Sequence, residues 1–93
     1  MNFLLSCENI TMKLSAEITL YPLQDDYLPA IKGTIDKLNT YSNITVNTFP
    51  TATILVGDYQ AVMFAIQEVV AWSYTTFGKC IFITKFIPDY EAE

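Results

Sequence analysis

The segment 15–38 constrains the fold most, because it predicts a β-strand, a tight break and an α-helix in succession. Its first residues alternate between apolar and polar, and successive side chains of a strand point to opposite sides of a sheet. One face of this strand suits a core and carries Ala16, Ile18 and Leu20. The other face is polar, with a central carboxylate and a terminal aromatic ring, and carries Ser15, Glu17, Thr19 and Tyr21. Solvated faces more often carry many Lys and Glu residues, so this face is a candidate binding surface.

The first strand is predicted over 13–21, with Pro22 ending it because proline cannot donate a ladder hydrogen bond. A helix to about Asn39 follows, and we expect Asp25 or Asp26 to cap its N-terminus by accepting hydrogen bonds from the first turn. Its apolar positions recur at spacings of three and four, which predicts one buried stripe made of Leu28, Ile31, Ile35 and Leu38.

The second half of the chain predicts two strands, a long helix and a last strand. Thr-rich and β-branched runs place strands at 44–49 and 51–56. Gly57 ends the third strand, Asp58 is predicted to cap a helix over 59–76, and Gly78 stops that helix before a strand over 79–87. The order βαββαβ predicts an α+β, ferredoxin-like sandwich with a four-stranded antiparallel sheet and two helices on one face. The right-handed crossover rule places strands one and three in the middle.

The second face of such a sheet has no helix to cover it. If the alternation holds, the last strand places Cys80, Phe82, Thr84 and Phe86 on this face. Two large aromatic rings should not be left in water. We therefore expect another subunit, a ligand or both to cover this face.

The composition bounds the class of protein. The 93 residues predict one domain over 12–88, with a lead-in segment over 1–11 and an acidic tail over 89–93; Met1 and Met12 both remain possible functional starts. A net charge of −5 opposes nucleic acids, and the absence of His excludes Ser-His and Cys-His catalytic pairs. Cys7 and Cys80 form no metal-ligand cluster and fit a reducing cytoplasm. No segment is long enough to span a membrane.

A family resemblance covers about 12–86. The run SAEITLYPLQDDYLPAIKGTIDKL, then TATILVGDY and the long helix from Asp58, resembles the YkoF-like thiamine/hydroxymethylpyrimidine-binding proteins, including shorter single-domain thiamine-binding proteins. The resemblance implies that the chain binds thiamine or its pyrimidine moiety without transforming it, as part of thiamine supply or salvage, and needs no cofactor. YkoF looks like two such units in one chain, so this single unit is expected to form a homodimer or homotetramer. The ending at 85–89 departs from the family's Gly/Cys-Pro ending, so contacts from that end are not carried over.

The predicted ligand-binding set contains no catalytic or metal-ligating residue; it comprises Glu17, Thr19, Tyr21, Asp26, Thr53 and Thr84. The Glu17 carboxylate can accept hydrogen bonds from an aminopyrimidine, or it can be an exposed residue paired with a Lys on a neighbouring strand. Tyr21 can stack on a flat heterocycle or simply pack. Asp26 can bind a ligand amine or the thiazolium charge, or be a neighbour of the helix cap. Thr53 is otherwise an ordinary strand former.

Two other classes of function remain open. The first is an oligomeric regulatory or structural module of the same fold without thiamine affinity, which a saturating thiamine site would exclude. The second is a small dimeric monooxygenase or isomerase, which the absence of His and of an acid-base pair disfavours. We also expect unphosphorylated ligands to be preferred over thiamine diphosphate, since the chain has no Arg and its first helix opens with two carboxylates.

Overall fold

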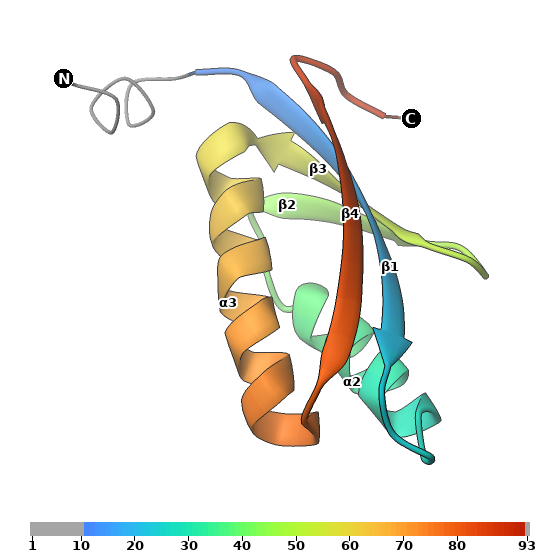
Figure 1. Cartoon of the computed structure of the whole chain (residues 1–93). Coiled ribbons are helices and arrows are strands. Elements are labelled where there is room, and N and C mark those ends of the chain that lie inside the picture. The colour runs from blue at the N-terminus through green and yellow to red at the C-terminus, as the bar shows by residue number, and fades with distance from the viewer. Residues whose placement is uncertain (1–10, 93) are drawn as a thin grey trace, which may run out of the picture.

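The computed structural model describes residues 11–92, and in this range two helices lie on the same side of a four-stranded antiparallel sheet (Figure 1). The predicted lead-in therefore lies outside the described residues, apart from Thr11, and so does Cys7. The elements are, in chain order, β1 (Lys13–Pro22), α2 (Leu28–Leu38), β2 (Ile44–Thr48), β3 (Thr53–Asp58), α3 (Tyr59–Phe77) and β4 (Cys80–Pro88). The sheet order β2-β3-β1-β4 confirms the ferredoxin-like prediction, with β1 and β3 in the middle.

The core lies between the two helices and one face of the sheet. The apolar side chains of β1 point to this face. Leu14, Ala16 and Ile18 are buried there and pack in one cluster with side chains from the other strands and both helices. The neighbours of these three residues in the cluster include Leu38, Leu55, Val62, Ala65 and Val69. The alternation of β1 is confirmed, and its polar row lies on the opposite face of the sheet. We call this opposite face the open face.

Helix α2 differs from the prediction in its start and in the side that it buries. Its N-cap is Tyr27, and neither Asp25 nor Asp26 caps it, because the helix begins at Leu28 with Pro29 in its first turn. Proline lacks the N–H that a cap would satisfy. The predicted stripe is also only partly buried: Leu28 is 65% exposed, and the buried positions are Ala30, Thr34 and Leu38.

Small residues explain why α2 packs through a different side. A Cβ atom built on Gly33 would lie 2.5 Å from Cζ of Phe77, so glycine leaves the space that the Phe77 ring occupies. At the next residue, the buried Thr34 hydroxyl donates to the hydroxyl of Ser73, which lies one turn before Phe77 on α3. The two helices therefore meet through small and hydroxyl-bearing positions, and the bulkier stripe turns partly toward the β2–β3 hairpin.

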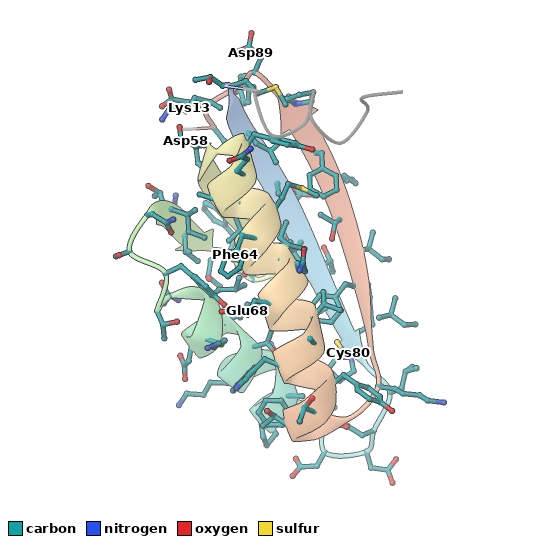
Figure 2. All side chains as sticks on the ribbon, turned by 90° about the vertical axis from the view of Figure 1, so that its left-hand side faces the viewer. Lys13, Asp58, Phe64, Glu68, Cys80 and Asp89 are labelled. Atoms are coloured by element: carbon teal, nitrogen blue, oxygen red, sulfur yellow. The ribbon has the colours of Figure 1, made fainter. Side chains whose placement is uncertain are left out.

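Helix α3 begins and ends where the sequence predicts, although its N-terminus is not capped by a side chain. Asp58 occupies the N-cap position, but its carboxylate accepts from Lys13 Nζ at 3.0 Å instead of from the first turn of the helix (Figure 2). The bond to Asp58 and its charge raise the pKa of the Lys13 ammonium. Gly78 ends the helix in the left-handed region, with φ of 97°, and its N–H donates to the Tyr74 carbonyl at 2.9 Å.

An aromatic cluster joins the end of α2 to the outer side of α3. The Tyr41 hydroxyl donates to the carboxylate of Glu68, which Figure 2 shows on α3. Lys37 Nζ lies 5.7 Å from the centre of the Tyr41 ring and 5.8 Å from that of the Trp72 ring, within the range of cation–π attraction. Partial burial, and then the Glu68 bond and charge, raise the pKa of Tyr41 to about 12.

The raised pKa of Tyr41 predicts a loss of stability in alkaline solution. The folded state favours the neutral phenol, so its contribution to stability is fully present below the ordinary pKa of 10 and is lost as the pH rises through about 12. Urea unfolding of the wild type and of Tyr41→Phe, measured between about pH 8 and pH 12, should show an excess stability of the wild type that shrinks above pH 10. An excess that stays constant over this range would contradict the prediction.

Candidate functional site

The register of β4 overturns one prediction about the open face. Directly opposite residues of an antiparallel pair share a face. Phe82 lies opposite Leu20, Thr84 opposite Ile18, and Phe86 opposite Ala16. These β4 side chains, together with Cys80, therefore lie on the helix side of the sheet and not on the open face. The prediction fails because β4 is apolar at odd and even positions alike, so its sequence does not say which set faces the helices.

The open face is consequently aliphatic beside the polar row of β1. The β4 residues that share it are Ile81, Ile83, Lys85 and Ile87, opposite Tyr21, Thr19, Glu17 and Ser15. All three isoleucines are about half exposed. On the other side of β1, the β3 residue opposite Glu17 is Ile54, which also lies on the open face. The arrangement is a short polar row flanked on both sides by branched apolar side chains, which suits a flat ligand with a polar edge.

Glu17 carries the central carboxylate of this row. Its Oε1 lies 3.7 Å from Lys85 Nζ, so the alternative of an ion pair with a neighbouring strand is present in the structure. The two side chains are 44% and 75% exposed, respectively, and exposed pairs of this kind contribute only about 0–1 kcal/mol. A pair this loose leaves the carboxylate available to accept hydrogen bonds from a ligand.

Thr19 and Tyr21 continue the row toward the end of β1. The Thr19 hydroxyl donates to the Thr51 carbonyl at 3.3 Å, which fixes its direction and leaves its oxygen able to accept. Tyr21 is about half exposed and lies opposite Ile81. An aromatic ring held beside an aliphatic side chain can stack on a heterocycle.

A separate pocket lies between α2 and the β2–β3 hairpin. It has a volume of about 80 Å³, and its lining includes Thr19, Ile31, Ile35, Phe49, Pro50 and Thr53. Pockets that bury drug-sized ligands span about 300–1,000 Å³. This pocket can therefore take at most a small part of such a ligand within one subunit.

The structure thus brings together three of the six predicted ligand-binding residues. Glu17, Thr19 and Tyr21 share the open face. Thr53 and Thr84 lie on the helix side, where the buried Thr53 hydroxyl lies 3.3 Å from that of Thr48. Asp26 lies in an exposed loop between β1 and α2 and is on neither face.

The sequence reading missed Lys85 and the three isoleucines. The alternating side chains of β4 can be assigned to the two faces of the sheet in two ways. One of these assignments places Lys85 beside Glu17 and the isoleucines on the open face. The ion pair then acts as an independent indication that this assignment is the correct one.

Other chemistries find little support among the described residues. No group of three His, Cys, Asp or Glu side chains in residues 11–92 could hold a metal ion. Partial burial raises the pKa of the Cys80 thiol, which disfavours a reactive thiolate. Cys80 lies near the start of β4, at the end of α3 opposite to Lys13 and Asp58 (Figure 2). Of the helices described, neither has the length and apolar character needed to cross a membrane.

Residues 13–83 match the model of the YKOF-related family. This range runs from the first residue of β1 into the middle of β4 and contains all three row residues. A comparison with curated proteins found no match.

Solved structures share the fold at low sequence identity. Hypothetical protein MJ1052 of Methanocaldococcus jannascii superposes with a TM-score of 0.71 at 22% identity, over 87% of this chain and 84% of that one. TM0486 of Thermotoga maritima, described provisionally as a thiamine biosynthesis/salvage protein, gives 0.68 at 20% identity over 85% and 84%. A Bacillus cereus domain of unknown function, DUF77, gives 0.68 at 10% identity over 83% and 76%.

Proposed function

The chain belongs to the YKOF-related family, and from this premise we propose that it binds thiamine or its hydroxymethylpyrimidine moiety without transforming it. The observation that carries the proposal is the row of Glu17, Thr19 and Tyr21 on one open, half-aliphatic face, inside the region that matches the family. The provisional thiamine role of the Thermotoga maritima protein supports it. We place this binding in thiamine supply or salvage in the cytoplasm.

In this proposal, each part of the row has a chemical role. Glu17 accepts hydrogen bonds from the exocyclic amine and a protonated ring nitrogen of the aminopyrimidine. Tyr21 stacks on the ring, and Thr19 offers a hydroxyl oxygen at its edge. A net charge of −5 also favours the positive thiazolium of thiamine. None of these roles requires a group that titrates near neutral pH, which fits binding better than catalysis.

We further propose that two or four copies associate through the open face. The isoleucines of β4 are about half exposed on this face, and burial of such side chains favours association. The pocket between α2 and the β2–β3 hairpin, with a volume of about 80 Å³, is also too small to enclose a whole ligand in one subunit. A second copy laid over the row would exclude water from the Glu17 carboxylate and strengthen its hydrogen bonds.

The oligomer is the first expected result. Light scattering and sedimentation velocity should give a mass of two or four chains at micromolar concentration. Ile83→Lys, which places a charge in the middle of the face, should shift the mass toward one chain, whereas the same change at the exposed Leu28 of α2 should not. A wild type that stays monomeric across the micromolar range would refute association through this face.

Calorimetric titration with thiamine, hydroxymethylpyrimidine and thiamine diphosphate tests the proposed function. We expect the first two to bind and the diphosphate to bind more weakly, because the diphosphate makes the ligand net negative and the chain offers no Arg fork. Lys85, the cation next to Glu17, and Lys32 of α2 are the groups near the sheet and the first helix able to offset this preference. Tighter binding of the diphosphate that disappears in Lys85→Gln would reveal a phosphate site at this lysine. Failure of all three ligands to bind would favour an oligomeric module without thiamine affinity.

A further inference from the structure

The residues that follow β4 fold back over the open face. Asp89 adopts a left-handed conformation with φ of 58°, and its N–H donates to the Lys13 carbonyl at 2.7 Å. The Ser15 hydroxyl then donates to the Tyr90 carbonyl at 2.7 Å and accepts from the Ala92 N–H at 2.8 Å. Figure 1 shows the chain turning at the end of β4 beside the first residues of β1. We call residues 89–92 the strap.

The strap accounts for an unusual burial pattern. Ser15 is 3% exposed and Val56 is 9% exposed, although both belong to the face that the helices α2 and α3 leave uncovered. Glu17, one step further along the same row, is 44% exposed. The strap therefore covers the open face at Ser15 and Val56, while Ile87, opposite Ser15, stays about half exposed and the region around Glu17 and Tyr21 stays accessible.

A docked strap is incompatible with pairing of two whole open faces. Two sheets that pack face to face lie about 10 Å apart, a gap that their own interleaved side chains fill. A two-fold interface uses the same patch on both copies, so each copy would bring its strap into this gap. An extra layer of backbone between the sheets would hold them apart.

Few hydrogen bonds hold the strap to the rest of the described residues, 11–92. They are one backbone hydrogen bond to Lys13 and two bonds to a single hydroxyl, that of Ser15. The Glu91 carboxylate adds a weak attraction to the Lys13 ammonium. Asp89 turns the chain at a positive φ, which aspartate adopts more readily than most residues but less readily than glycine. A segment docked in this way can detach without unfolding the sheet.

We propose that the strap competes with a second copy of this chain for the part of the open face around Ser15. While it is docked, two copies can pair only through the part around Glu17; when it is released, they pair over the whole face. This inference rests on the open-face association proposed above. In this proposal the Ser15 hydroxyl holds the strap in place. This role differs from the ligand-binding role of Glu17, Thr19 and Tyr21.

Three variants of the full protein test the proposal. Ser15→Ala removes both hydrogen bonds between the Ser15 hydroxyl and the strap, and deletion of residues 89–93 removes the strap itself. Thr75→Ala is the matched control, since it removes an exposed hydroxyl from α3, away from the open face, while leaving the two Ser15 bonds in place. Hydrogen exchange of the C-terminal peptide reports docking of the strap, and sedimentation velocity gives the association constant. Thermal melts followed by circular dichroism check that each variant is folded.

We expect faster exchange of the strap amides in Ser15→Ala and roughly tenfold tighter association in both Ser15→Ala and the deletion, as the loss of two competing hydrogen bonds implies. Thr75→Ala should match the wild type in both measurements. If the wild type associates and the deletion does not change the constant, the strap is no competitor, although open-face pairing stands. Weaker association of the deletion would equally overturn the proposal, since the strap would then assist pairing. If no variant associates, both the strap proposal and the open-face pairing fail, while the thiamine titration still decides ligand binding.

Discussion

Glu17→Gln is expected to weaken thiamine binding roughly ten- to a hundredfold, because a charge-assisted hydrogen bond contributes about 1.5–3 kcal/mol. A carboxylate accepts from both the exocyclic amine and the protonated ring nitrogen, whereas an amide matches only part of this pattern. The free energy of unfolding should change little, since the carboxylate is 44% exposed and its ion pair with Lys85 is loose. Calorimetric titration gives the dissociation constants, and urea unfolding gives the stabilities.

Lys85→Gln is the matched control for this experiment. It breaks the same ion pair, also by introducing an amide, but leaves the Glu17 carboxylate intact. Thiamine binding should be retained or slightly tightened, because a positive charge near the thiazolium is removed. An unchanged dissociation constant in Glu17→Gln would make Glu17 an ordinary surface residue. An equal loss in both variants would assign the effect to the ion pair.

Leu55→Ala is expected to lower the free energy of unfolding by about 2–5 kcal/mol, the range for deleting a large aliphatic side chain from a core. Leu55 is 0% exposed and lies in the central strand β3, opposite Ala16 on one side and Val46 on the other. Small domains have total stabilities of about 5–15 kcal/mol, so a large part of the stability would be lost.

The exposed Leu28 of α2 provides the control for the core prediction. Leu28→Ala makes the same chemical change at a side chain that is 65% exposed, and we expect a change within about 0.5 kcal/mol. Urea unfolding of the three proteins at one pH compares them directly. Equal losses in the two variants would mean that the core does not lie between the sheet and the helices.

The fold could be predicted because its strongest signals are local. In β1 the apolar and polar positions differ clearly, so the strand shows which face it buries. Asp58 and Gly78 mark the ends of α3 within a residue. The helix α2 was less predictable because its packing depends on the contact of Gly33 with Phe77, which comes from a residue 44 positions further along the chain. No local pattern contains that contact.

The candidate site could be predicted only as far as one strand determines it. Glu17, Thr19 and Tyr21 lie on one face because they alternate within β1. Thr84 was predicted on the wrong face, and no face was predicted for Thr53, because both depend on how β4 and β3 pair with β1. The whole of β4 is apolar except Thr84 and Lys85, so hydrophobicity alone cannot fix its register. Asp26 required the path of a loop, which sequence patterns do not give.

The position of β4 at the edge of the sheet has a consequence for solubility. Within the described residues no strand pairs with its outer side along these nine residues, and both of its faces carry apolar side chains. A long apolar edge of this kind can pair with the edge of any other sheet and start aggregation. Lys85, the single charged residue of β4, interrupts the apolar run in its second half. The lysine beside Glu17 therefore also acts as a gatekeeper that disfavours irregular strand addition. We therefore expect Lys85→Gln to remain more soluble than a variant with an aliphatic side chain at this position.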